Sequence, residues 1–118
     1  MVTVQDLRKR EPELARLKPN DGELEVLIEK AINDFCLQCK LEYGYSIANI
    51  ETKPKYDILI EFLTLSYVFE SLIKTEDIYL VKADRYKNLY NEWFAKLNYN
   101  NTNINGLYAT CETIPILR

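Results

Sequence analysis

The sequence predicts an all-α fold: a four-helix bundle-like domain followed by an extended, β-type C-terminal tail. Apolar residues recur at helical spacing in three long stretches. Residues that favour turns, mainly Pro, Asn, Asp and Gly, separate these stretches. Residues 107–118 change to a mixture of β-branched and apolar side chains around a proline. At 118 residues and 47% hydrophobic content, the chain is sufficient for one buried core.

The first helical segment covers residues 4–17 and is interrupted. Thr3 is a suitable N-cap, and Asp6 places an acid in the first turn. Pro12 removes a backbone donor and disfavours helix at the preceding residue, so two short pieces are expected. Because the apolar stripe is weak, we expect this segment to pack loosely or to move.

The second helix is the most clearly marked. It follows a Pro-Asn-Asp-Gly break in which Asn20 or Asp21 can cap it, and it continues to about residue 41. Gly44 is a natural stop. The expected apolar face consists of residues three or four positions apart: Leu24, Leu27, Ile28, Ala31, Ile32, Phe35 and Cys39.

The third helix, residues 55–74, is apolar around most of its circumference. Such a helix is buried by its neighbours or by other subunits, so it is expected at the centre of the bundle. Pro54 suits its first turn. In the connection before it, Ile47 and Ile50 are expected to reach the core.

The fourth helix, residues 78–97, is expected to begin at a Thr-Glu-Asp cap and to carry an aromatic edge. Its helically spaced residues are Ile78, Val81, Arg85, Tyr86, Leu89, Tyr90, Trp93, Phe94 and Leu97. Aromatic residues at this spacing usually belong to a core. Tyr and Trp are also favoured at protein interfaces, and a surface for stacking ligands is a third alternative.

The helical domain is therefore expected to span residues 1–97, and residues 98–118 to form a tether and a tail. Residues 98–106 are rich in asparagine and too polar to order themselves. Pro115 forbids helix in the tail. An apolar, extended tail on a polar tether is typical of a strand that adds to a partner's sheet or groove. The candidate protein-interface residues are Leu107, Tyr108, Ile114, Ile116 and Leu117 in the tail, with Tyr86, Tyr90 and Trp93 on the fourth helix.

No pattern in the chain indicates catalysis, a metal site or a cofactor. There is no histidine, and no Gly-rich phosphate loop is present. Cys36 and Cys39 form a Cys-x-x-Cys, but the pair lies inside an apolar helix face and Cys111 is alone. This arrangement favours two core thiols over a zinc site, with a regulatory disulfide as the alternative.

The acids on the third helix also have an interpretation that involves no catalysis. Asp57, Glu61 and Glu70 could serve acid–base chemistry or bind metal, but a di-metal bundle site would need Glu-x-x-His pairs. They are expected instead on the solvent strip of the helix or in salt bridges between subunits. We therefore expect the protein not to be an enzyme.

Charge and hydropathy restrict the partners. The net charge is −3 and the isoelectric point about 5.0, with bases interleaved among acids, which argues against tight nucleic-acid binding. Polar residues interrupt the most apolar stretch, so no membrane span is expected. The first residues lack the features of a signal peptide, and three cysteines fit a reducing cytosol.

Four stretches resemble the head–tail adaptor (head-completion, connector) proteins of tailed bacteriophages and gene transfer agents. Residues 2–17 resemble the family's short opening helix, and residues 20–35, with the LIEKAI sequence, its acid-led second helix. Residues 54–72 are similar to its apolar third helix and residues 81–97 to its fourth. The resemblance covers residues 3–97 and includes no diagnostic motif. Pro12 and the long asparagine linker depart from the family pattern.

The resemblance implies a structural virion protein at the head–tail interface, made in the host cytoplasm. Such adaptors form a homo-oligomeric ring, typically of twelve subunits, under the portal protein. They extend the DNA channel and receive a stopper or tail-completion protein, and DNA passes without sequence-specific binding. In the family the C-terminal tail docks on the portal or a neighbour, and residues 107–118 are the candidate here. The alternative is a small helical regulatory module that sequesters another protein through its Tyr86–Trp93 surface.

Overall fold

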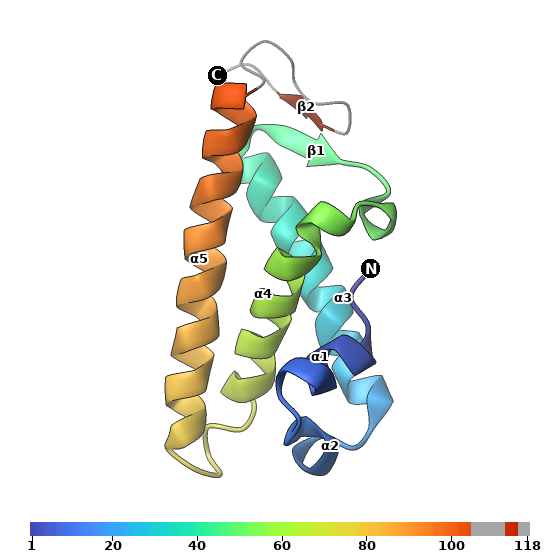
Figure 1. The fold of residues 1–118 in the computed structure, drawn as a ribbon, viewed down its shortest axis with the longest axis vertical. Helices are drawn as coiled ribbons and strands as arrows, with labels where there is room; N and C mark the ends of the chain where they lie inside the picture. The colour runs from blue at the N-terminus through green and yellow to red at the C-terminus, as the bar shows by residue number, and fades with distance from the viewer. Residues whose placement is uncertain (105–112, 116–118) are drawn as a thin grey trace.

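The computed structural model describes the backbone of residues 1–104 and 113–115, with their side chains except at residues 45, 51, 98–104 and 113–115. The fold is all-α and bundle-like, with one two-stranded pairing (Figure 1). The main elements are α1 (Val4–Arg10), α2 (Leu14–Leu17), α3 (Asp21–Gln38), β1 (Tyr45–Ile47), α4 (Asp57–Glu70), α5 (Ile78–Ile104) and β2 (Thr113–Pro115).

The two short N-terminal helices confirm the predicted break at Pro12, but they are firmly packed. The Thr3 side chain and Asp6 form a reciprocal capping box at the start of α1. Leu7 and Leu14 are completely buried. The expectation of loose packing was therefore wrong, because two fully inserted leucines compensate for the sparse apolar stripe.

Polar contacts also attach this N-terminal part to helices far along the chain. Lys82 Nζ of α5 lies 2.7 Å from a carboxylate oxygen of Glu11 and 2.6 Å from one of Glu13. Tyr86 Oη donates a hydrogen bond to Glu11 as well. Because these partners lie about 70 positions away, no local pattern could have revealed them.

Helix α3 begins and presents its apolar face as predicted. Asn20 is the N-cap, and its side chain accepts a hydrogen bond from the Gly22 amide. Leu24, Ile28, Ala31, Phe35 and Cys39 of the expected face are buried, and Leu27 and Ile32 pack partly against the core. A π-helical turn, η1 (Cys39–Tyr43), follows α3 directly. This helical segment ends at Gly44, whose φ of 74° is the left-handed conformation that glycine adopts easily.

Helix α4 is the centre of the bundle, as its composition predicted. It lies between α3 and α5, and ten of its fourteen residues are buried, including three polar ones. A short 3-10 turn, η3 (Pro54–Tyr56), precedes it, and another, η2 (Ile50–Thr52), lies in the connection. Ile50 is buried and Ile47 packs partly against the core, as expected.

Helix α5 differs from its prediction in face and in length. Tyr79, Ala83, Tyr86, Tyr90 and Phe94 form its buried face, whereas Ile78 and Val81 are exposed. The face that packs is the one with the larger aromatic area, and Tyr79 and Tyr86 stack on Phe69 of α4.

The helix also continues to Ile104 and crosses the boundary at which a tether was expected. Once a helix exists, each added residue contributes a backbone hydrogen bond, which here outweighs the low helix propensity of asparagine. Residues 98–104 are therefore helical, where the start of a tether was expected.

The C-terminal strand pairs within the chain. β2 is antiparallel to β1, with Tyr45 opposite Pro115 and Ile47 opposite Thr113. The strand character of the tail is confirmed at residues 113–115, and its partner is part of the connection before α4. None of the described helices is both long and apolar enough to cross a lipid bilayer.

Candidate functional site

The aromatic residues predicted for an interface separate into two groups. Tyr86 and Tyr90 are buried, and Tyr90 Oη donates a 2.6 Å hydrogen bond to Gln38 Oε1 of α3. Burial raises the pKa of both phenols, and the Glu11 carboxylate raises that of Tyr86 further. These two side chains belong to the core and are not presented to a partner, which corrects their placement at an interface. Trp93 is 41% exposed and stays at the surface.

The candidate residues of the tail cannot be placed as fully. Ile114 lies in β2, opposite Ser46 of β1. Leu107, Tyr108, Ile116 and Leu117 lie outside the described residues. Their predicted interface role stays a prediction.

Of the three acids of α4, Glu70 is exposed, as expected for a solvent strip, Asp57 is partly buried and Glu61 is buried. Glu61 is buried and lies 2.6 Å from Arg10 Nε, so it has a partner within the chain. Burial raises its pKa despite the neighbouring guanidinium. Asp57 pairs with the N-terminal ammonium at 3.0 Å, and Glu70 is exposed.

No chemical centre emerges from the described residues. Within them, no group of three or more His, Cys, Asp or Glu side chains is arranged to hold a metal ion. Cys39 is completely buried, and burial raises the pKa of the partly buried Cys36 thiol. A raised pKa makes the reactive thiolate scarce, which agrees with a packing role for the Cys-x-x-Cys pair.

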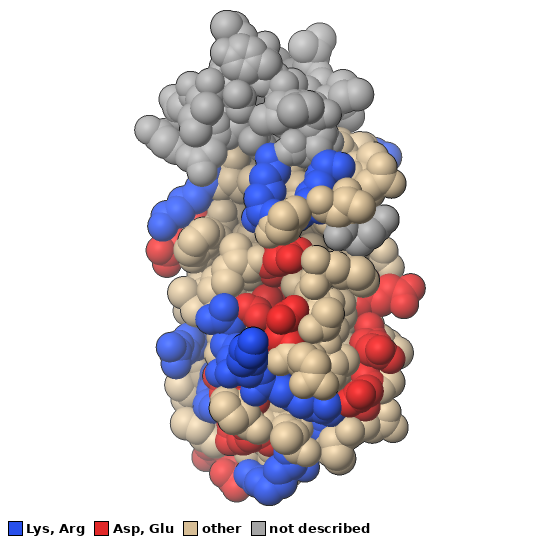
Figure 2. Space-filling view, turned by 45° about the vertical axis from the view of Figure 1, so that its right-hand side comes forward, with Lys and Arg blue, Asp and Glu red and all other residues tan. Residues whose placement is uncertain are grey.

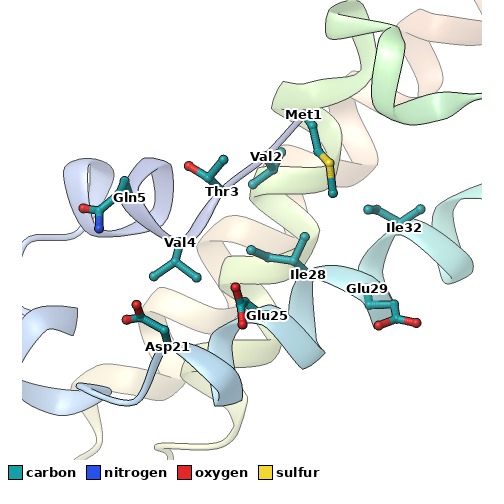
Figure 3. Close-up of a pocket in the computed structure, with 10 residues that line it drawn as sticks. All are labelled: Met1, Val2, Thr3, Val4, Gln5, Asp21, Glu25, Ile28, Glu29 and Ile32. Carbon is teal, nitrogen blue, oxygen red and sulfur yellow. The ribbon is translucent and has the colours of Figure 1, made fainter.

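A surface groove lies between the N-terminal segment and α3 (Figure 3). Its volume is about 550 Å³. Val2 and Val4 face Ile28 and Ile32 across it. Glu25 and Glu29 stand on the α3 side, and among the described residues neither pairs with a base. The groove is therefore an apolar depression with an acidic wall.

A second surface surrounds Trp93, on α5. The indole packs edge-on against Phe62 of α4, with ring centroids 6.4 Å apart. Lys96 Nζ lies 5.4 Å from the indole, and the Arg10 guanidinium 5.3 Å from the Phe62 ring. Arg85 lies 6.0 Å from the neighbouring Tyr86 ring. We call the exposed Trp93 with Arg10, Arg85 and Lys96 the tryptophan patch, in which Arg85 lies about two helical turns before Trp93 on α5.

Charges of opposite sign are unevenly distributed over the molecule. Figure 2 shows acidic side chains lined up along one edge of the view and basic side chains gathered beside them. Helix α3 contributes the exposed acids Asp21, Glu23, Glu25 and Glu29, whereas α1 ends in Arg8, Lys9 and Arg10. Some of these charges offset each other within the chain, since Arg8 pairs with Asp21 at 2.6 Å and Lys18 with Glu23 at 3.4 Å.

The groove escaped the sequence analysis, because its walls come from residues about 25 positions apart whose packing was judged loose. One signal was available: the regular spacing of Asp21, Glu25 and Glu29 places three acids on one side of α3. Of the aromatic candidates on α5, Trp93 is exposed, and its interface role stays a prediction, whereas Tyr86 and Tyr90 are core residues.

Comparison with known protein families, with characterised proteins and with solved structures finds no match to this chain. The two surfaces must therefore be interpreted from their own geometry.

Proposed function

We propose that this protein is a head–tail adaptor of a tailed bacteriophage or gene transfer agent: a structural virion component and not an enzyme. It would form a homo-oligomeric ring beneath the portal protein, extend the DNA channel and receive a stopper or tail-completion protein.

The order of the elements carries the proposal. A broken N-terminal helix precedes an acid-led helix, a buried central helix, a long aromatic helix and a terminal strand. The resemblance to head–tail adaptors implies this order, apart from the break at Pro12 in the first helix, which departs from the family pattern. Each helix of the resemblance corresponds to a helix of the structure, with the first corresponding to the α1–α2 pair.

Two further features support an assembly role. The chain has surfaces suited to protein contacts, namely the tryptophan patch and the acid-walled groove. Its net charge of −3 suits a conduit through which DNA must move, because tight phosphate binding would hinder passage.

Co-assembly with the portal protein encoded in the same genome tests the proposal. The purified chain and the portal would be mixed and analysed by gel filtration with light scattering. We expect a complex whose mass corresponds to a ring of adaptors on a portal. No complex, together with complete particles formed when residues 107–118 are deleted, would contradict the adaptor function.

The exposed Trp93 also supports the alternative, a small regulatory module that sequesters another protein. Gene position separates the two cheaply. A gene beside portal, capsid and tail genes agrees with the adaptor, and a gene in an early operon agrees with the regulator.

A further inference from the structure

We infer that the chain associates head to tail with copies of itself, with Trp93 of one copy inserted into the groove between the N-terminal segment and α3 of the next. The inference rests on the proposed function only in identifying this contact as the one that builds the adaptor ring. The self-association can be measured without any other protein.

Trp93 has the properties of an interface anchor. It is 41% exposed, yet its position is fixed by the edge-on contact with Phe62. An aromatic side chain held in place loses little conformational entropy on binding, and tryptophan and arginine are enriched among residues that dominate binding energy. Arg10 is held in the same way, by Glu61 and the Phe62 ring.

The groove has the properties of the complementary site. Its volume of about 550 Å³ lies within the range of pockets that enclose small ligands, and an indole ring is smaller than such ligands. Its apolar wall includes the tightly packed Val2 and Ile28, which are 4% and 5% exposed, and the half-buried Ile32 and the exposed Met1 add the apolar surface that an inserted ring can reach. Ile28 lies on a long, capped helix, so this wall exists before any partner binds.

The charges at the two surfaces are opposite. Within the tryptophan patch, Arg10 pairs with Glu61 and Lys96 pairs with Glu92. The exposed Arg85 has no ion pair among the described residues, so it supplies the positive charge of the patch. Glu25 and Glu29 supply negative charge at the groove. Placing Arg85 of one copy near Glu25 and Glu29 of the next favours one orientation of the two copies.

The two surfaces lie at different places on the same molecule. Helix α5 lies along one edge of the fold, and the N-terminal segment and α3 lie toward the other (Figure 1). A contact between two different patches leaves one patch of each type available on every dimer. Further copies therefore add, and the assembly closes into a ring if the rotation between copies permits.

Sedimentation velocity up to about 1 mM chain tests the contact. The wild-type protein should show an average mass that rises with concentration. Trp93→Ala and the double variant Glu25→Lys/Glu29→Lys should each associate at least about 30-fold more weakly, as loss of an interface anchor does. Association should also weaken between low and high salt, because the rim charges are screened.

Mixing the two variants gives the sharper test. Trp93→Ala retains its groove and the double variant retains its tryptophan, so an equimolar mixture should form dimers and nothing larger. A symmetric contact between two tryptophan patches would instead let the double variant associate with itself like the wild type, because both patches of that contact are intact. The inference would be overturned by that self-association of the double variant, by a wild-type chain that is monomeric at about 1 mM, or by unchanged association of either variant.

Matched controls separate the contact from general effects of substitution. Leu37→Ala removes an exposed apolar side chain elsewhere, and Glu70→Lys/Glu76→Lys makes the same charge change away from both surfaces. Both controls should associate like the wild type. Circular dichroism should show the same helical content in every variant.

Portal binding distinguishes this inference from the proposed function. If the copies associate as described but no portal is bound, the contact stands and the adaptor function fails. If Trp93→Ala forms the same portal complex with the same number of copies, the adaptor function stands and this contact is not the one that builds the ring.

Discussion

The carboxylate of Glu61 experiences two opposing influences. Burial on α4 disfavours its charged form, and the Arg10 guanidinium 2.6 Å away favours it. Burial dominates, so the pKa of Glu61 is raised above its ordinary value of 4.5. The folded protein therefore holds this proton more tightly than the unfolded chain does.

Glu61→Gln should reveal this difference in its pH dependence. A raised folded pKa contributes stability below the unfolded pKa, and this contribution is lost as pH rises through the folded pKa. The free energy of unfolding of the wild type, minus that of Glu61→Gln, should therefore fall between pH ~4 and ~7. Urea titrations across this range would measure it, with the exposed Glu76→Gln as control. A difference that rises with pH would contradict the assignment.

Lys82 connects α5 to the segment between α1 and α2. Burial opposes its charge, but hydrogen bonds from Lys82 to Glu11 and Glu13 outweigh this, and the pKa of Lys82 is raised. Lys82→Met would leave two carboxylates without their cation and should cost about 1–2 kcal/mol of unfolding free energy. Lys96→Met, which breaks an exposed pair on the same helix, should cost less than about 0.5 kcal/mol. Equal costs for the two would show that the Lys82 cluster adds no stability.

At the level of elements, α1 behaves as part of the core. Leu7 is 0% exposed, and Leu63 of the central helix is 2% exposed, so both side chains are fully inserted in the core. Leu7→Ala and Leu63→Ala should therefore each cost about 2–5 kcal/mol. Val26→Ala, at a position that is 66% exposed, should cost little. Thermal and urea unfolding would compare the three, and a negligible effect at Leu7 would restore the expectation of a loosely packed first segment.

The elements that sequence predicted best are those whose signals are local. Asn20 and Gly44 bound the α3–η1 segment, and its apolar face lies in the predicted register, because capping and helical spacing depend only on nearby residues. The apolar composition of α4 predicted its central position for the same reason.

The elements that sequence predicted poorly depend on distant contacts. The packing of α1 needs Lys82 and Glu61, and the face of α5 is chosen by stacking on Phe69. Among the aromatic residues predicted for an interface on α5, Trp93 lies at the surface, whereas Tyr86 and Tyr90 are buried in the core. The groove appears only when Val2 and Ile28 are brought together.

For the whole molecule, the tail is expected to be dispensable for folding. The buried hydrophobic residues among the described side chains all lie between Val2 and Phe94. Deleting residues 107–118 removes the short β1–β2 pairing and should change the melting temperature by less than about 5 °C. The truncated chain should nevertheless assemble poorly with the portal. Unfolding of the truncated chain would show that the tail belongs to the core.

The Glu11–Lys82 contact also has a consequence for biosynthesis. A contact that joins residues 71 positions apart cannot form until most of the chain has been made. During translation, the segment that joins α1 to α2 therefore cannot complete its contacts until Lys82 of α5 leaves the ribosome. Long-range contacts of this kind slow folding and leave apolar surface open to aggregation in the meantime. The N-terminal helices should accordingly be the last part of the bundle to become protected in a pulse-labelling experiment on the refolding chain.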